Sequence, residues 1–163
     1  MTPSKECLDL IKRFEGYRSE AYQCSAKVWT IGWGTTRYPD GRAVKKGDTC
    51  SMDQAAEWLA DDVAKRSMNV LALLPPTIKQ SQFDALVSFS YNLGIGALRS
   101  STLLRKIKVD SNDPTIYTYT KENGMPVVGS CEFLKWVKAG GKVLNGLILR
   151  RAAEADLYKK AQH

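Results

Sequence analysis

The segment from Tyr17 to Thr49 carries a different residue pattern from the segments on either side of it. Aromatic and β-branched residues alternate there with Gly32, Gly34, Gly47 and the dipeptide Asp40-Gly41. Short strands joined by tight turns have this pattern. The flanking segments instead carry apolar residues at helical spacing. The pattern therefore predicts an α+β fold in which a small antiparallel sheet lies between helices in the sequence.

Helix start and stop signals mark the helices on both sides of the expected sheet. Thr2-Pro3 is typical of a helix start and predicts a first helix over residues 3–15. Ser51 opens a capping box, and the apolar stripe after it predicts a helix over residues 52–74, which the following two prolines end. A helix of about 20 residues spans about 30 Å. It is long enough to join two lobes, with residues 17–50 as the β lobe.

Residues 77–163 are expected to form a helical lobe. Thr77 with Gln80 repeats the capping signature. The dipeptide Asn123-Gly124 is a strong hairpin signal and predicts a surface hairpin over residues 115–128. The apolar residues that predict the last two helices are Phe133, Leu134 and Val137, before Gly140-Gly141, and those from Leu147 to Tyr158.

Composition places the chain among ordinary globular proteins, with 44% apolar and 25% charged residues in a length of 163. This length fits one domain over residues 1–163. Because no apolar run is long enough for a membrane span and the N-terminus lacks the apolar core of a signal peptide, we expect synthesis in a cytoplasm and no stable membrane insertion. The four cysteines form no C-x-x-C pair, so no metal site is expected, and they permit two disulfides in any of three connectivities.

The net charge is +7, from 24 Lys and Arg residues against 17 Asp and Glu residues. Such a charge favours acidic partners, which include nucleic acid, anionic lipid and the bacterial cell wall. The basic residues are scattered in short clusters such as Lys45-Lys46 and Arg150-Arg151. Nucleic acid is therefore not expected as a partner.

Three side chains near the expected sheet are candidates for a role in catalysis. Glu15, at the end of an apolar helix and facing a sheet, fits the general acid of glycosidic bond cleavage, although an exposed glutamate at a helix end also fits. Cys24 fits a small buried residue, half of a disulfide or a thiolate. A Cys-His mechanism is excluded because the single histidine is His163 at the chain end. Thr30 fits either a hydroxyl that holds a water or a plain strand former.

The spacing of these three residues resembles a known signature. Glu15, eight residues, Cys24, five residues and Thr30, followed by Ile31-Gly32-x-Gly34, are similar to the catalytic signature of the phage lysozymes. These are the endolysin muramidases of glycoside hydrolase family 24, in which the middle position is Asp or, in a subgroup, Cys. The stretches "QSQFDALVSFSYNLGIGAL" and "EFLKWVKAGGKVLNGLILRRAAEADLY" resemble the central helix with its turn and the C-terminal helices of the family. The resemblance implies a lysozyme-like fold with a small β lobe and a larger helical lobe.

The resemblance also implies roles for the three residues. Glu15 is the general acid, and Cys24 as thiolate activates or replaces the water that attacks the anomeric carbon, with Thr30 positioning that water. The family usually inverts the anomeric configuration, but a sulfur nucleophile leaves net retention open. Lys27, where the family often has Gly, lies close enough in sequence to lower the pKa of the Cys24 thiol by its charge.

Other positions match the family more weakly. Thr36, Tyr91 and Asn92 correspond to residues that line the sugar cleft between the lobes, although Tyr91 and Asn92 also fit a simple helix end before Gly94. Arg150 and Arg151 resemble the C-terminal arginine pair of the family, of which one is expected to approach Glu15. Thr35 stands where the family often has His.

By this resemblance the chain is an endolysin that hydrolyses the β-1,4 bond between N-acetylmuramic acid and N-acetylglucosamine in peptidoglycan glycan strands, for host lysis. It needs no cofactor and no metal, acts as a monomer, is made in the host cytoplasm and reaches the periplasm through a separate holin. A disulfide through Cys24 would hold the enzyme inactive. Two alternatives stay open: a catalytically impaired peptidoglycan-binding module on the same fold, and a basic nucleic-acid binder.

Overall fold

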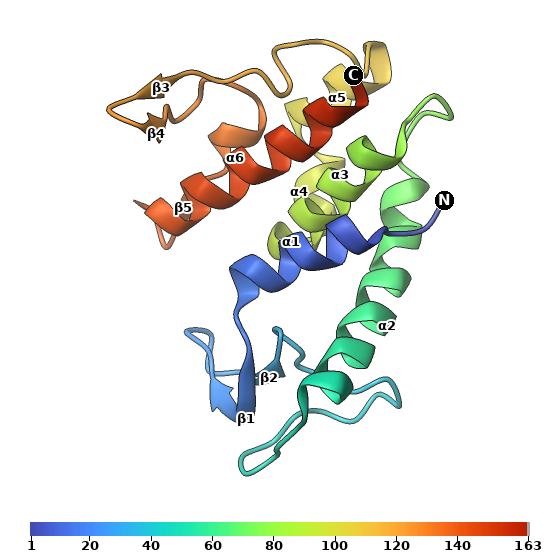
Figure 1. Ribbon diagram of the computed structural model, residues 1–163, viewed down its shortest axis with the longest axis vertical. Helices are drawn as coiled ribbons and strands as arrows, with labels where there is room; N and C mark the ends of the chain where they lie inside the picture. Colours follow the sequence, from blue (N-terminus) through green and yellow to red (C-terminus); the bar gives the residue numbers. More distant parts are fainter. Residues whose placement is uncertain (163) are drawn as a thin grey trace.

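The computed structural model describes residues 1–162 and has an α+β fold, as the sequence predicts. A small β lobe lies at one end of a long helix, and a larger helical lobe lies at the other end (Figure 1). The β lobe contains β1 (Arg18–Gln23) and β2 (Trp29–Gly32), which pair antiparallel, and α2 (Met52–Leu71) is the long helix. The other elements are α1 (Lys5–Glu15), α3 (Gln80–Leu93), α4 (Ile95–Arg99), α5 (Thr102–Val109), β3 (Lys121–Glu122), β4 (Met125–Pro126), the 3₁₀ turn η1 (Phe133–Lys135), β5 (Lys138–Ala139), β6 (Lys142–Val143), α6 (Asn145–Lys159) and the 3₁₀ turn η2 (Lys160–Gln162).

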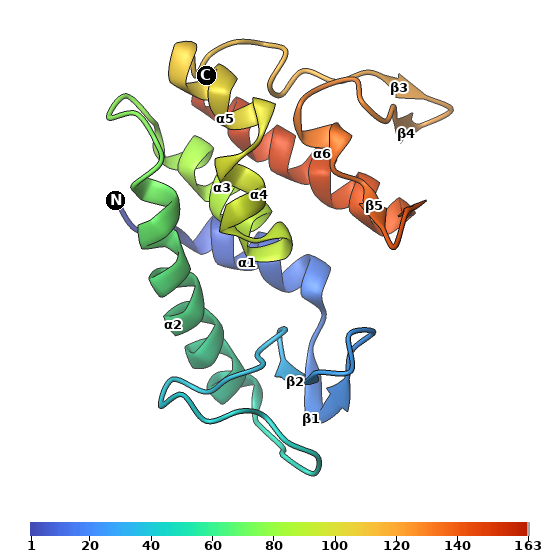
Figure 2. The same cartoon turned by 180° about the vertical axis from the view of Figure 1, so that it is seen from behind.

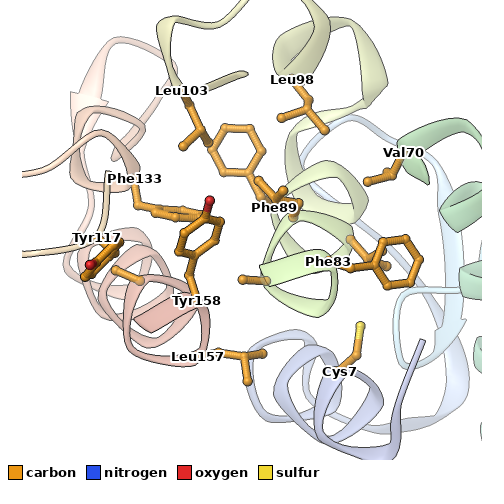
Figure 3. Close-up of a cluster of buried hydrophobic side chains, with 14 of the residues drawn as sticks. Cys7, Val70, Phe83, Phe89, Leu98, Leu103, Tyr117, Phe133, Leu157 and Tyr158 are labelled. Carbon is orange, nitrogen blue, oxygen red and sulfur yellow. The ribbon is translucent and has the colours of Figure 1, made fainter. Parts of the chain in front are cut away.

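Helix α3 is the centre of the helical lobe. It packs against α1, α2, α4 and α6 (Figure 2), and every residue from 82 to 90 is buried. Phe83 and Phe89 point to different parts of the core, where Phe89 meets Phe133 edge to face at 5.9 Å between ring centroids (Figure 3). Each such side chain contributes about 1.5–3 kcal/mol by leaving water. Helix α1 belongs to this core although the β lobe follows it in sequence, so its last residue lies where the two lobes meet (Figure 1).

The first helix begins at Lys5 rather than at Thr2-Pro3. Ser4 is the N-cap, and its hydroxyl accepts from the backbone N–H of Cys7 at 3.4 Å. The buried carboxylate of Asp84 on α3 accepts from both the backbone N–H and the hydroxyl of Ser4, at 3.1 and 2.5 Å, and from the Gln80 amide at 2.9 Å. This long-range contact, which no local sequence signal carries, decides where the helix starts.

Replacing Asp84 by Ala is expected to lower the free energy of unfolding by about 3 kcal/mol, because three part-buried hydrogen bonds to a charged acceptor are lost. Urea unfolding followed by circular dichroism measures this change. The control is Asp9→Ala, which removes an exposed ion pair with Lys5 and is expected to cost less than about 0.5 kcal/mol. An equal effect of the two substitutions would contradict the assigned role of Asp84.

Two predicted helix boundaries are wrong by a few residues. Helix α2 has the expected capping box at Ser51, but it ends at Leu71 instead of residue 74, because a turn precedes the prolines. Helix α3 begins after Lys79, whose backbone N–H donates to the Gln82 side chain at 3.0 Å, so the cap is not the expected Thr77-Gln80 pair.

The penultimate predicted helix is absent from the described residues. Phe133–Lys135 form only a 3₁₀ turn, and β5 and β6 then make a tight hairpin around Gly140-Gly141. Both glycines have positive φ, 57° and 79°, which a two-residue hairpin turn requires and a helix forbids. The Asn123-Gly124 hairpin is present, but its strands cover only residues 121–126 of the expected 115–128.

In residues 1–162 no helix combines the length and the apolar character that crossing a bilayer demands. All four cysteines are free thiols: Cys7 and Cys131 are buried, and Cys24 and Cys50 are half-buried.

Candidate active site

Glu15 is the last residue of α1, where Gly16 ends the helix with a φ of 71°. Its side chain is 23% exposed, and its Oε1 accepts from Nη1 of Arg150 on α6 at 2.9 Å. Its other oxygen lies against the turn after β2. A Cβ atom at Gly34 would be 3.0 Å from Oε2, and Gly34 has a φ of 86°, so this position needs glycine for both reasons. The Glu15 carboxyl is thus held between the two lobes in one orientation.

Tyr91 on α3 lies beside the same turn. Its hydroxyl donates to the carbonyl oxygen of Trp33 at 3.2 Å and would be 3.4 Å from a Cβ at Gly34. Burial, with smaller contributions from Asp62 and Glu15, raises the pKa of the phenol, so Tyr91 stays neutral near neutral pH. Tyr91 therefore connects the helical lobe to the β lobe next to Glu15.

Cys24 and Thr30 lie on the β1–β2 hairpin. The Cys24 N–H donates to the Val28 carbonyl at 3.0 Å, and the Lys27 N–H donates to the Cys24 carbonyl at 2.8 Å. Lys27 has a φ of 60°, so the connection is a turn followed by a left-handed residue, the position that glycine favours. Thr30, opposite Tyr22 in the strand pair, is buried, and its hydroxyl donates to the Val28 carbonyl at 3.0 Å.

The pKa of the Cys24 thiol is lowered by the hairpin that carries it. Hydrogen bonding from the backbone at Val28, and then at Ala26, holds the pKa of this thiol below its ordinary value. The charge of Lys27 is not among the causes, although the sequence suggested it. The expected electrostatic role of Lys27 is therefore replaced by hydrogen bonds of the hairpin itself.

Substituting Lys27 by Gly is expected to raise the free energy of unfolding by about 1 kcal/mol, because a residue with a Cβ is strained at a positive φ. Urea unfolding measures the gain. The control is Lys46→Gly at an exposed turn position outside the left-handed region, where added chain entropy is expected to destabilise the fold. Loss of stability in both variants would show that the left-handed turn is not the constraint.

Arg150, Arg151 and Asn92 form a second group at the middle of α6, and Thr36 is not part of it. Arg151 is fully buried and donates from Nη2 to Oδ1 of Asn92 at 2.8 Å. Of the two arginines, Arg150 is thus the one that contacts Glu15. Thr36 is half-buried, and its carbonyl accepts from the Val44 N–H at 3.0 Å.

Glu154 is a residue of this group that the sequence reading missed. Its side chain is fully buried and lies 2.7 Å from Nε of Arg151 and 3.6 Å from Nε of Arg150. The Ser88 hydroxyl donates to it at 2.6 Å. The spacing of Arg150, Arg151 and Glu154, three and four residues apart on one helix, is the signal that could have indicated it.

Thr35, at the position where the resemblance implies a histidine, is 2% exposed, and its hydroxyl has no hydrogen-bond partner among residues 1–162. Within the same described range, no group of three His, Cys, Asp or Glu side chains is placed to hold a metal ion.

Comparison with known proteins shows which family the chain resembles. The family model described as phage lysozyme matches residues 12–154. The endolysin of Bacillus phage B103 is 41% identical over 160 residues, which are 97% of this chain and 54% of that protein, so this chain spans about half of that relative. The endolysin of Acyrthosiphon pisum secondary endosymbiont phage 1 is 39% identical and is covered over 98% of its length, against 97% of this chain.

The solved endolysin from Escherichia coli O157:H7 phage FAHEc1 has the same architecture. It superposes with a TM-score of 0.75 at 34% identity, over 99% of this chain and 95% of that one. The matched residues 12–154 include Glu15, Cys24, Thr30 and the arginine pair. On this evidence the chain belongs to the phage lysozyme family.

Proposed function

We propose that this chain is a muramidase that hydrolyses the β-1,4 bond between N-acetylmuramic acid and N-acetylglucosamine in peptidoglycan. The observation that carries the proposal is the fixed Glu15 carboxyl, which contacts Arg150 at 2.9 Å and packs against Gly34 in a chain of the phage lysozyme family. A glycosidase needs a carboxyl group aimed at the glycosidic oxygen, with a second group on the other side of the sugar.

In this mechanism Glu15 donates its proton to the leaving oxygen as the glycosidic bond breaks. The Cys24 thiolate takes a proton from the attacking water, whose oxygen bonds to the anomeric carbon, or attacks that carbon itself before water displaces it. Thr30 donates its hydroxyl hydrogen to the Val28 carbonyl, so its oxygen is free to accept from that water. Thr36, Tyr91 and Asn92 would contact the sugar, Arg150 holds Glu15, and Arg151 holds Asn92.

The biological setting that fits this activity is host lysis. A net charge of +7 suits an anionic cell wall. In this setting the protein is synthesised in the host cytoplasm and released to the periplasm through a holin. It acts there as a monomer without a cofactor.

The test is digestion of purified peptidoglycan sacculi, with mass spectrometry of the released muropeptides. The proposal predicts new reducing ends on N-acetylmuramic acid and loss of turbidity in permeabilised Gram-negative cells. Binding to sacculi without new reducing ends would instead support an impaired wall-binding module. Strong salt-dependent affinity for DNA, again without new reducing ends, would support a nucleic-acid binder.

A further inference from the structure

The buried carboxyl group of Glu154 has no role in the steps above. Only the Arg150 side chain lies between it and the proposed acid, Glu15. Its side chain is 0% exposed in the middle of α6. A charged group is almost never buried in this way unless it is paired. The three groups that hold it are Arg150, Arg151 and the Ser88 hydroxyl.

Arg150 connects Glu154 to Glu15. Its guanidinium uses Nη1 for Glu15, at 2.9 Å, and Nη2 for the carbonyl of Ser88, at 3.3 Å. Its Nε faces Glu154 at 3.6 Å. The side chain of Arg150 is only 4% exposed, so its charge must be balanced by protein groups rather than by water.

This balance matters because a general acid changes its charge during the reaction. When Glu15 carries the proton that it donates, it is neutral and no longer balances Arg150. Burial raises the pKa of the Glu154 carboxyl, while the charges of Arg151 and Arg150 act in the opposite direction and favour its ionised form. In that ionised form Glu154 is the buried anion that remains beside the guanidinium. We propose that Glu154 is a positioning residue that holds Arg150 and balances its charge while Glu15 is protonated. This inference rests on the proposed role of Glu15 as the acid.

Other groups do not supply this balance near neutral pH. The titratable and charged groups near the cluster are Cys7 on α1, Asp84 and Tyr91 on α3, and Asp62 and Arg66 on α2. Burial raises the pKa of the Cys7 thiol and of the Tyr91 phenol, so both stay neutral. Asp84 is engaged with Ser4, and Asp62 pairs with Arg66 at 2.9 Å.

The chain offers a matched pair of variants. Glu132 is also buried, at 3% exposed, and is also held by two cations, Lys106 at 3.0 Å and Lys135 at 2.7 Å, but it does not contact the arginine pair. Glu154→Gln and Glu132→Gln therefore each remove one buried, doubly paired negative charge while keeping the side-chain shape. Only Glu154→Gln is expected to lower kcat on peptidoglycan, by about tenfold or more, with KM changed by less than about twofold.

The pH dependence gives a readout that a purely structural role would not move. Removing the Glu154 anion leaves Arg150 to favour the ionised form of Glu15, so the proton is lost at lower pH. The alkaline limb of the pH–rate profile should move to lower pH by about half a unit or more in Glu154→Gln and stay in place in Glu132→Gln. Ser88→Ala, which keeps every charge but frees the Glu154 carboxylate, should lower kcat in the same direction by a smaller factor.

The titration of Glu15 followed by carbon-13 NMR of labelled carboxyl groups separates the two proposals. If the parent protein cleaves peptidoglycan but Glu154→Gln leaves both kcat and the NMR midpoint of Glu15 unchanged, the positioning role is overturned and the muramidase proposal stands. If the parent releases no muropeptides, the muramidase proposal fails. The midpoint of Glu15 still decides the coupling, since a shift to lower pH in Glu154→Gln alone supports it and an unchanged midpoint overturns it.

Discussion

Glu15→Gln is expected to reduce the release of muropeptides by about 10³-fold or more while the protein stays folded. The amide has nearly the same shape as the carboxyl group and can still accept from Nη1 of Arg150, so the lobes keep their contact. The amide N–H protons are far too weakly acidic to be transferred to the leaving oxygen, and protonation of that oxygen is the step for which a glycosidase uses its acid. Chromatography of muropeptides at several enzyme concentrations measures the loss, and a thermal melt checks the fold.

A suitable control is Glu57→Gln on the exposed face of α2, which removes the same charge away from the site and should leave the rate unchanged. Residual activity within about tenfold of the parent in Glu15→Gln would remove Glu15 from the role of acid. A melting temperature far below that of the parent would mean that the Arg150 contact serves mainly to hold the lobes together. Binding to sacculi should persist in Glu15→Gln, because the substitution leaves the proposed sugar contacts of Thr36, Tyr91 and Asn92 unchanged.

The sequence predicts the elements that local signals determine. The capping box at Ser51 places the start of α2 correctly, and Asn123-Gly124 places a hairpin turn. Thr2-Pro3 has the local chemistry of a helix start, but Asp84, 80 residues away from Ser4, fixes the actual cap of α1. Gly140-Gly141 has the local chemistry of a helix end, but two glycines in succession equally fit the hairpin turn that the structure has there.

The candidate site likewise has features that local sequence signals predict and features that depend on the packing of distant segments. Glu15, Cys24 and Thr30 lie within 16 positions of one another, so their spacing is visible in the sequence. The closeness of Gly34 to the Glu15 carboxyl and the buried network around Glu154 depend on how α1, α3 and α6 pack, which no local pattern encodes. The same applies to the cause of the lowered Cys24 pKa. Lys27 is the obvious charge in sequence, but the turn it adopts supplies backbone hydrogen bonds instead.

Cys24→Ala is expected to lower the rate of peptidoglycan cleavage by about 10²-fold or more, because the attacking water loses its base. Cys24→Asp should keep the rate within about tenfold of the parent, since a carboxylate can also accept the water's proton. Cys24→Ser should resemble the alanine variant, because a hydroxyl is not ionised near neutral pH. Muropeptide release by the three variants, measured beside the parent over a range of pH, gives these ratios.

The pH profile tests the thiolate directly. The thiol must lose its proton to act, so the parent's activity rises with pH through the thiol pKa, which the hairpin holds below its ordinary value. In Cys24→Asp this acidic limb should move to lower pH, toward the carboxyl range near about 4. Iodoacetamide should inactivate the parent and spare Cys24→Asp, whereas Cys50→Ala, at the other half-buried thiol, should behave like the parent in both respects. Full activity in Cys24→Ser, or an acidic limb that Cys24→Asp leaves in place, would exclude the sulfur from the reaction and leave water held by Thr30 to attack without a base.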